Sequence, residues 1–379
     1  MNKFEKAQQI LQSLNVDGWL IFCTEDNDIN SRYLLGVGSH APHFIYIASD
    51  GMHKVLPAVM EANMVKNSLK KKGVDAEIIP FKTLGELAEH LKPIIDKSKI
   101  ALNFGENLLQ VDGTGFADYI PVGIYTALQR LAPNTEFISA APIIYELRSV
   151  KSSEQLDDLR NVCKATMEIL ETIPDVVKVG MTEKEVMANL ECKYLKLGKS
   201  SFPAIVAAGK NSADPHHNSS PEKIKLGPLL IDTGLIIDEM CSDITWTFWV
   251  GKNPPDDFIS AYNALFDAKE IANKYYVANN PCNLPAKKCR EHLEKIGFDH
   301  EKLFFHGLGH SLGFEVHGVG PRISWKVPDT DILEENMVYT NEPGLYWIGK
   351  WGIRLEDNVI IKKEKCEQVT EVPKEPILI

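Results

Sequence analysis

The acidic residues of the second half constrain this chain most, because they stand inside strongly apolar, strand-like stretches. The stretch LLIDTGLIIDEMCSDITWTFWVG contains Asp232 and Asp243, and the stretch VYTNEPGLYWIGKWGIRLEDNVII contains Glu342 and Glu356. Aspartate is depleted from strands, and like charges that face each other destabilise a sheet. A fold that pairs these strands must therefore supply positive charge close to the acids.

The first stretch can form a hairpin that brings its two acids face to face. If the chain turns at Ile237–Asp238, Asp232 and Asp243 are directly opposed, with their Cβ atoms roughly 5 Å apart. Asp238 and Glu239 then belong to the turn, and we predict no metal role for them.

The second stretch has the same symmetry. Glu342 and Glu356 are 14 residues apart, and the residue midway between them is Gly349, a natural turn residue. Pro343 is awkward in a central strand and fits a strand end or a bulge. This hairpin also predicts two facing carboxylates.

Three of the 11 histidines, His306, His310 and His317, lie among four glycines in the segment FFHGLGHSLGFEVHG. A metalloprotease helix also places two histidines four residues apart. Here two glycines separate the first pair, and each interior glycine costs a helix about 1 kcal/mol. An extended segment or bend is therefore expected to present these side chains.

Four carboxylates and an imidazole suit Mn²⁺, Co²⁺ or Zn²⁺. Five ligands exceed one structural zinc site and suit two metals about 3.5–4 Å apart. Either acid pair alone could be a solvated turn face, and the histidines alone could be structural. The three patterns together in one half of the chain favour a metal site.

Composition narrows the class of protein. The net charge of −11 disfavours nucleic acid or an anionic membrane as the main partner. No apolar run approaches the ~20 residues that span a bilayer, and MNKFEKAQQILQSLN is typical of a surface helix, not a signal peptide. Seven scattered cysteines without a C-x-x-C motif indicate reduced thiols and a cytoplasmic location.

The length predicts two domains. The first alternates helix-like and strand-like segments, which indicates an α/β domain. Ser152 or Ser153 can cap a long helix, and Thr182 with Glu185 forms a capping-box pattern before another. Further helices are expected at 256–276 and 285–296, and apolar strands at 228–234, 242–250, 337–343 and 352–361.

At these acids and histidines the second half resembles the peptidase family with the pita-bread fold, which includes methionine aminopeptidase, aminopeptidase P, prolidase and creatinase. The first half resembles the smaller N-terminal domain of the last three, and LRSVKSSEQLDDLR resembles their linker helix. The resemblance implies an α/β creatinase-like domain at residues 1–147 and an α+β pita-bread catalytic domain at residues 148–379.

The family's metal pattern is matched at five positions, namely Asp232, Asp243, His310, Glu342 and Glu356. The resemblance implies two divalent ions per subunit, Mn²⁺ or Co²⁺, with Zn²⁺ as an alternative. Asp232 would bind one metal, His310 and Glu342 the other, and the remaining two acids both. Glu342 would also pass a proton to the leaving nitrogen.

Other positions match family residues around the substrate. His216, in GKNSADPHHN, and His317 resemble histidines that hydrogen-bond the substrate or the tetrahedral intermediate, and His306 resembles one that lines the pocket. Arg354 resembles an arginine that organises the acids. Arg322 resembles the arginine with which prolidases hold the free carboxylate of a dipeptide.

The resemblance therefore implies a prolidase, in which a hydroxide held between two metals attacks the scissile carbonyl of an Xaa-Pro dipeptide. The alternative is an aminopeptidase P that removes the first residue from longer Xaa-Pro peptides. A creatinase-type hydrolase of a non-peptide C–N bond and a non-catalytic binding module remain further alternatives, although the full ligand set speaks against both.

Three residues depart from the usual family pattern, namely Met240, Trp246 and Gly318, and the resemblance alone places them near the site, where they bear on substrate preference. Two-domain members are usually homodimers with a loop near the partner's active site. The loop candidate here is residues 36–44, where His40 or His43 would reach a neighbouring site unless the segment is a plain surface loop.

Overall fold

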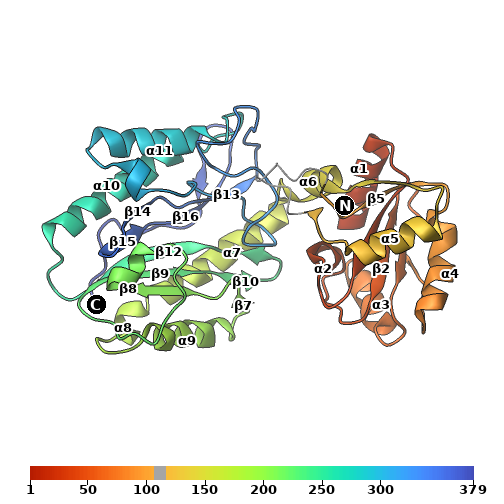
Figure 1. Ribbon diagram of the computed structural model, residues 1–379, viewed down its shortest axis with the longest axis horizontal. Helices are drawn as coiled ribbons and strands as arrows, with labels where there is room; N and C mark the ends of the chain where they lie inside the picture. The colour runs from red at the N-terminus through yellow and green to blue at the C-terminus, as the bar shows by residue number, and fades with distance from the viewer. Residues whose placement is uncertain (106–116) are drawn as a thin grey trace. The chain divides into compact units, whose positions relative to one another are not determined.

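The computed structural model describes residues 1–105 and 117–379. These residues divide into two compact units, Met1–Arg148 and Ser149–Ile379 (Figure 1). The predicted boundary after residue 147 lies one residue before this division.

The first unit is built around one mixed sheet. Its helices are α1 (Lys3–Leu14), α2 (Ile29–Leu35), α3 (Ala62–Lys71), α4 (Leu84–Ile95), α5 (Val122–Leu131) and α6 (Ala141–Arg148). Its strands are β1 (Gly18–Cys23), β2 (His43–Ala48), β3 (Lys54–Leu56), β4 (Glu77–Ile78), β5 (Lys99–Leu102) and β6 (Glu136–Ser139), in the order β4-β3-β2-β1-β5-β6. β1 runs antiparallel to β2 and parallel to β5.

The central strands of this sheet are buried on both faces, as their uniformly apolar sequences require. Every residue of β1 and β2 is buried. Leu20 and Phe22 of β1 belong to the same apolar cluster as Leu87 and Leu91 of α4. Helix α1 packs against β2 and α6. Helices cover the sheet in an α/β arrangement, which confirms the predicted class of this unit.

The second unit places helices around several small antiparallel sheets. Its helices are α7 (Ser153–Leu170), α8 (Ile173–Val176), α9 (Glu183–Tyr194), the 3₁₀ helix η2 (Gly209–Ala213), α10 (Asp256–Asn273), α11 (Leu284–Lys295) and α12 (His300–Leu303). Its strands are β7 (Lys199–Ser200), β8 (Ile205–Ala208), β9 (Gly227–Thr233), β10 (Leu235–Ile237), β11 (Met240–Cys241), β12 (Ile244–Val250), β13 (Val338–Asn341), β14 (Gly344–Trp347), β15 (Trp351–Arg354), β16 (Asp357–Ile360) and β17 (Glu367–Gln368).

The sheets pair as β12-β9-β8, β13-β16-β17, β14-β15 and β11-β10-β7. Helix α7 packs on β10 and β11, α9 on β8, and α10 on β13 to β15. The predicted capping box of Thr182 and Glu185 is confirmed at the start of α9. Of the two serines predicted to cap the preceding long helix, Ser152 is the cap of α7, and it forms a capping box with Gln155.

The predicted register of the first hairpin is wrong by two residues. Asp232 pairs with Thr245 and not with Asp243, so the two aspartates are diagonal neighbours on one face. The turn falls at Asp238–Glu239, and Asp238 has φ +55°. Aspartate tolerates this left-handed conformation, whereas a β-branched residue such as Ile237 does not.

The predicted register of the second hairpin is confirmed. β14 pairs with β15 across a turn that contains Gly349 (φ +80°), and β13 pairs with β16 in the same register. Glu342 and Glu356 therefore lie opposite each other in the interruption between the two ladders, beside Pro343. The single strands expected at 337–343 and 352–361 are broken at this interruption.

A buried ion pair connects α10 to β16, the strand that pairs with β13. The Lys269 ammonium contacts the Asp357 carboxylate, and both side chains are 0% exposed. Burial alone would lower the pKa of Lys269, but Asp357 and Glu270 outweigh it and raise the pKa. Asp357 also accepts hydrogen bonds from Gln368 Nε2 (2.8 Å) and Val372 N (2.9 Å).

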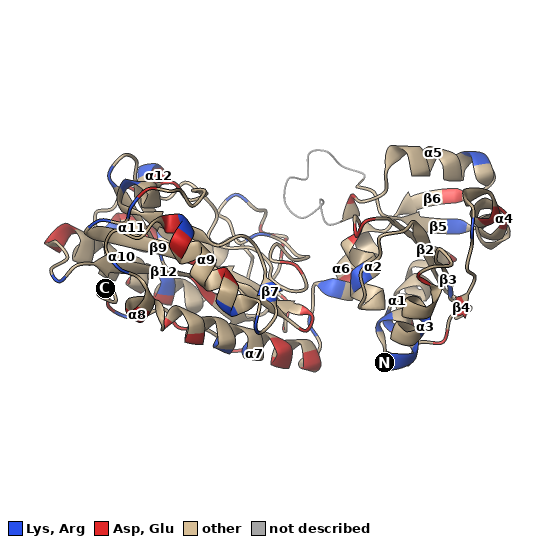
Figure 2. Cartoon of the chain, turned by 90° about the horizontal axis from the view of Figure 1, so that it is seen from below, with Lys and Arg blue, Asp and Glu red and all other residues tan. Residues whose placement is uncertain are grey.

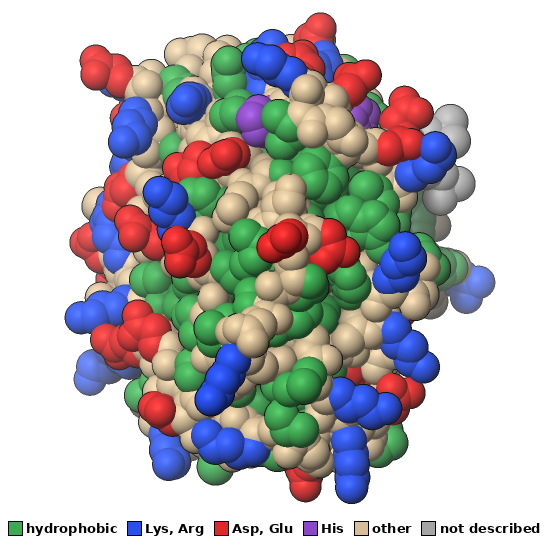
Figure 3. Space-filling view, turned by 90° about the vertical axis from the view of Figure 1, so that its left-hand side faces the viewer, with side chains coloured by type: hydrophobic (Ala, Val, Ile, Leu, Met, Phe, Trp, Pro, Cys, Tyr) green, Lys and Arg blue, Asp and Glu red, His purple; other side chains and the backbone are tan. Residues whose placement is uncertain are grey.

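On the face of the second unit that Figure 3 shows, green apolar side chains are surrounded by acidic and basic ones. Blue and red side chains are mixed in the upper and left parts of this face, and blue ones predominate along its lower edge. Among the described residues, no helix is both long enough and apolar enough to cross a membrane.

We expect Lys269→Met to lower the unfolding free energy of the metal-free protein by about 3–5 kcal/mol, because it leaves a buried carboxylate without its cation. Urea unfolding measures the change. The control is Lys164→Met, which removes an exposed pair with Glu168 at 3.9 Å and should change stability by less than about 0.5 kcal/mol. Equal losses in the two variants would contradict the assigned role of the buried pair.

Candidate active site

A cavity of about 410 Å³ in the second unit contains all the predicted site residues in its wall. Its polar lining is His216, Asp232, Asp243, His306, His310, His317, Arg322, Glu342, Arg354 and Glu356. Phe202, Ile205, Pro215 and Val316 add an apolar wall. A concave site with converging titratable groups and an apolar wall is the usual form of a small-ligand site.

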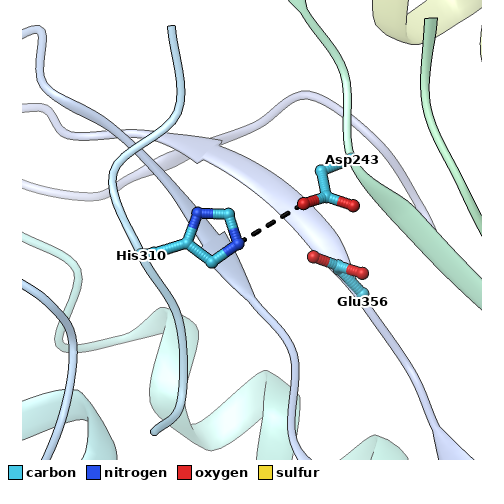
Figure 4. A group of neighbouring side chains, drawn as sticks. All are labelled: Asp243, His310 and Glu356. Carbon is cyan, nitrogen blue, oxygen red and sulfur yellow. Dashed lines mark ion pairs between the residues drawn. The ribbon is translucent and has the colours of Figure 1, made fainter. Parts of the chain in front are cut away.

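The centre of the cavity is a compact group of acids around one imidazole (Figure 4). One ligand atom from each of Asp243, His310 and Glu356 lies within 4.8 Å of the others. The Nε2 atom of His310 is 3.4 Å from Asp243 Oδ2 and 3.5 Å from Glu342 Oε1. Asp232 approaches from β9 and is close enough to affect the pKa of Asp243.

The backbone fixes these side chains from three directions. Asp232 stands near the end of β9, and Asp243 immediately precedes β12. Glu356 donates its N–H to the carbonyl oxygen of Thr245 (3.0 Å), which links the second hairpin to the first. The segment around His310 is extended, as predicted, and forms single bridges from Gly309 and Ser311 to neighbouring segments.

His310 is prepared to act as a ligand through Nε2. Its Nδ1 atom is 3.1 Å from the carbonyl oxygen of Ser311, so Nδ1–H is the donor and Nε2 carries the free lone pair. Metal-bound histidines commonly fix their tautomer with such a bond to a backbone carbonyl.

The acids fit divalent cations. Burial is the largest cause that raises the pKa values of Asp243 and Glu356, and neighbouring carboxylates add to it. Burial also raises the pKa of Glu342, although His310 and Arg354 oppose it. Within the described residues, Asp232 Oδ1 and Glu356 Oε1 are buried without a hydrogen-bond partner. Buried acceptors of this kind need a cation or protons to offset their desolvation.

Arg354 connects this acid group to its surroundings. Its Nη2 contacts Asp232 Oδ2, and its Nε donates to Thr245 Oγ1 (3.1 Å), which in turn donates to Glu356 Oε2 (2.6 Å). Burial would lower the pKa of Arg354, but Tyr346 and the acids outweigh it and raise the pKa. The arginine thus orients Asp232 by direct contact and Glu356 through the hydroxyl of Thr245.

His306 is held neutral beside the acids. Its Nδ1 is 2.7 Å from the carbonyl oxygen of Gly307, and its Nε2 is 3.0 Å from the hydroxyl of Tyr346, which also accepts from Arg354 Nη1 (3.1 Å). Burial is the main cause that lowers the pKa of His306 to about 3. Neutral His306 therefore donates from Nδ1 and accepts from Tyr346.

Two residues that the sequence did not single out support this segment. Tyr346 carries no motif, and its role arises from contacts with His306 and Arg354. Arg290 of α11 donates to the carbonyl oxygens of Phe304 (2.6 Å) and His306 (2.9 Å), and its guanidinium lies 3.4 Å from the ring centre of Trp325. The visible signal was a lone arginine on an amphipathic helix, which is too common to identify a site.

The remaining predicted residues lie at the rim of the cavity. The rings of His310 and His317 are 4.4 Å apart and meet edge to face. Burial, followed by His310, lowers the pKa of His317 to about 4. His216 and Arg322 are exposed and line the opening.

The three departures from the family pattern do not line this cavity. Met240 is fully buried in β11, and Trp246 is buried and pairs with Ile231, so it faces away from its neighbour Thr245. Gly318 packs closely on the chain, because a Cβ atom there would lie 3.0 Å from the carbonyl carbon of Leu312. These positions therefore reflect packing.

His43 is not a loop residue available to a partner subunit. It begins β2, is 1% exposed and lies 2.7 Å from Ser31 Oγ through Nε2. His40 is exposed, and its Nδ1 is 3.3 Å from Glu25 Oε2. Of the two histidines, the structure leaves His40 alone able to reach outward.

We expect Asp243→Asn to reduce the rise in melting temperature that added metal causes. In a chelator, Asp243→Asn should melt at or above the wild-type temperature, because the substitution removes one of several mutually repelling buried charges. Added Mn²⁺ should raise the melting temperature of the wild type by roughly 10 °C and that of the variant by less than half as much. Differential scanning calorimetry measures both shifts.

Asp238→Asn is the matched control, since it lies in the turn of the same hairpin, outside the cavity, and asparagine also accepts a positive φ. It should behave as the wild type in both conditions. An Mn²⁺ shift that Asp243→Asn leaves intact would contradict the proposed ligand role.

Two family models match most of this chain. Residues 157–363 match the metallopeptidase family M24, and residues 3–150 match the creatinase/prolidase N-terminal domain. An Xaa-Pro dipeptidase of Pyrococcus horikoshii is 31% identical over 294 residues, which cover 75% of this chain and 80% of that protein.

Two solved structures are similar along essentially the whole chain. The X-Pro aminopeptidase from Thermotoga maritima superposes with a TM-score of 0.85 at 27% identity and covers 100% of both chains. The Xaa-Pro dipeptidase from Bacillus anthracis gives a TM-score of 0.84 at 26% identity and covers 100% of this chain and 99% of the other. These matches confirm the predicted fold class. The chain belongs to the metallopeptidase family M24 and carries a creatinase/prolidase N-terminal domain ahead of its pita-bread catalytic domain.

Proposed function

We propose that this metallopeptidase is a prolidase that hydrolyses Xaa-Pro dipeptides. The observation that carries the proposal is the convergence of Asp232, Asp243, His310, Glu342 and Glu356 in one cavity whose rim holds His216, His317 and Arg322. Relatives named Xaa-Pro dipeptidase support the choice of substrate.

The proposed metal ligands fall into three roles. Asp232 would hold one divalent ion, His310 and Glu342 would hold a second, and Asp243 and Glu356 would contribute to holding both. We propose two ions per subunit, Mn²⁺ or Co²⁺ ahead of Zn²⁺, because the donor set is rich in hard carboxylate oxygens and contains one imidazole. Bound divalent ions would activate water as a nucleophile and polarise the scissile carbonyl.

The protein side chains perform the other steps. Glu342 accepts the proton that the attacking water loses and passes it to the leaving nitrogen. His216 and His317 donate hydrogen bonds to the carbonyl oxygen as negative charge develops there. His317 can do so as a neutral ring, which is the form that its lowered pKa favours at neutral pH.

Proline as the second residue explains the need for a shaped site. The nitrogen of an Xaa-Pro bond has no N–H, so strand-like binding of the substrate lacks one of its usual hydrogen bonds. We propose that His306 and the apolar wall receive the substrate, that Arg354 keeps the acids oriented, and that Arg322 binds the free carboxylate of the dipeptide.

An aminopeptidase P activity is the second candidate, because the structure similar at a TM-score of 0.85 is an X-Pro aminopeptidase. The two activities differ in the group attached to the carbonyl carbon of the proline. A free carboxylate suits the exposed guanidinium of Arg322 at the rim, whereas a longer peptide continues out of the cavity. The complete ligand set disfavours a creatinase-type hydrolase and a non-catalytic module.

Further properties remain proposals. We propose a homodimer in the cytoplasm, a domain boundary between residues 147 and 148, and no nucleic-acid or membrane partner. The exposed His40 is the candidate that reaches a neighbouring subunit.

The substrate proposal is tested by kinetics on the protein loaded with Mn²⁺ or Co²⁺. We expect Gly-Pro or Met-Pro to be cleaved with a kcat/KM at least about 10-fold above that of an Xaa-Pro-Pro tripeptide, since a hydrogen bond to a charged group contributes roughly 1.5–3 kcal/mol and ~1.4 kcal/mol corresponds to a factor of 10. Cleavage of the tripeptide alone would establish the aminopeptidase instead.

Replacement of Arg322 by alanine tests the carboxylate contact. We expect KM for the dipeptide to rise about 10- to 100-fold while kcat changes less than about threefold, because the contact exists in both the ground state and the transition state. KM for a C-terminally amidated dipeptide should barely change. An unaltered dipeptide KM would remove Arg322 from the site.

A further inference from the structure

The segment that carries His216 has little regular structure of its own. It leaves β8 at Ala208, forms the short η2 and returns to the sheet at β9. The backbone N–H of His216 donates to Asp214 Oδ1 (3.1 Å). A side chain on such a segment keeps its place in a cavity only if other parts of the protein fix the backbone on both sides.

One anchor is Glu183, the first residue of α9, whose charged first turn is coloured in Figure 2. Its side chain is 0% exposed. Oε1 accepts from Ala208 N (2.8 Å) and Asn211 Nδ2 (2.9 Å). Oε2 accepts from His217 Nε2 (2.8 Å), Ser220 N (2.8 Å) and Ser220 Oγ (2.6 Å).

This anchor requires a carboxylate. Five donors converge on two oxygens, and a glutamine would present an NH₂ group to some of them. Burial would raise the pKa of Glu183, but the hydrogen bonds from Ser220, Ala208 and Asn211 outweigh it and lower the pKa. The group is thus a buried anion that the segment solvates with its own donors.

The second anchor comes from the catalytic side. Arg354 Nη1 donates to the carbonyl oxygen of Pro215 (3.3 Å), and Gly352 N donates to Ser212 Oγ (2.9 Å). His216 lies between these contacts and the bond from His217 to Glu183. The adjacent histidines therefore have different tasks: His217 holds the segment, and His216 lines the cavity.

We propose that Glu183 is a positioning residue that holds His216 in the active site by gathering the donors of residues 208–220. The inference rests on the proposed contact of His216 with the substrate. Glu183 is not part of the cavity wall, and it acts only through this segment.

The first test compares Glu183→Gln with Glu185→Gln on metal-loaded protein. Glu183→Gln should lower kcat/KM about 10- to 100-fold, as small misplacements of a catalytic group do. Glu185 is the matched control, because it is exposed, lies two residues away on the same helix, and its carboxylate accepts hydrogen bonds from the half-buried cap residue Thr182. Glu185→Gln should leave kcat/KM unchanged even if it lowers the melting temperature.

A double-mutant cycle separates the inference from the proposed function. In a His216→Ala background, Glu183→Gln should lower kcat/KM by less than about threefold, because the residue that it positions is gone. Equal fold-losses with and without His216 would overturn the inference and assign Glu183 a general structural role. If His216→Ala alone leaves the kinetics unchanged, the proposed function of His216 fails instead.

Trypsin cleavage gives a readout that does not depend on activity or metal. Lys210 is exposed within the segment, and Glu183→Gln should speed cleavage after it at least fivefold, with no change for Glu185→Gln. Unchanged cleavage would contradict the anchor. If Glu183→Gln does not fold, His217→Phe and Ser220→Ala each remove a single side-chain donor and should show the same dependence on His216 in smaller measure; additive losses would overturn the inference.

Discussion

Mutual repulsion among buried carboxylates is the constraint on which the second unit depends. Asp232, Asp243, Glu342 and Glu356 line one cavity together with His310. Two unit charges about 4 Å apart repel by about 4 kcal/mol at an effective dielectric of 20. Arg354 offsets part of this energy at Asp232. The remaining unfavourable energy is what divalent cations would relieve if they bind at the proposed ligands.

The acids and the histidines of the site lie on different kinds of backbone. The acids lie in paired strands or directly beside them, and the flanking ladders hold the backbone that carries each carboxylate. The histidines, in contrast, come from extended or irregular segments that need anchors of their own. Arg290 holds the carbonyl oxygens before the glycine-rich segment, and Glu183 holds the donors around His216. One anchor is a buried cation that binds acceptors, and the other is a buried anion that binds donors.

Much of this arrangement could be predicted from the sequence where local chemistry decides it. The starts of α7 and α9 were predictable from their capping residues. The second hairpin was predictable because Gly349 is free to take the positive φ of the turn. The predicted register of the first hairpin is two residues off. The prediction placed the turn at Ile237–Asp238, whereas the structure places it one residue later, at Asp238–Glu239, with Asp238 in the left-handed conformation. Residues 36–44 overlap the buried strand that begins at His43, which leaves His40 as the exposed histidine of the candidate loop.

The parts that the sequence did not reveal depend on contacts between distant segments. Tyr346, Arg290 and Glu183 belong to no motif, and each acts on residues that the fold brings near. The four acidic ligands were recognisable because acids are rare in apolar strands, whereas a glutamate at a helix start is common and carries no such signal. Only the structure separates Glu183, which is buried, from Glu185, which is an ordinary cap.

One of the seven cysteine thiols is accessible to a labelling reagent. All seven cysteines are free, six of them are buried, and only Cys192 is exposed. Cys192 lies on α9, the helix that begins with Glu183. A maleimide dye added to the native, unmodified chain would therefore attach at one defined place, and its fluorescence would report on the helix that anchors the segment of His216.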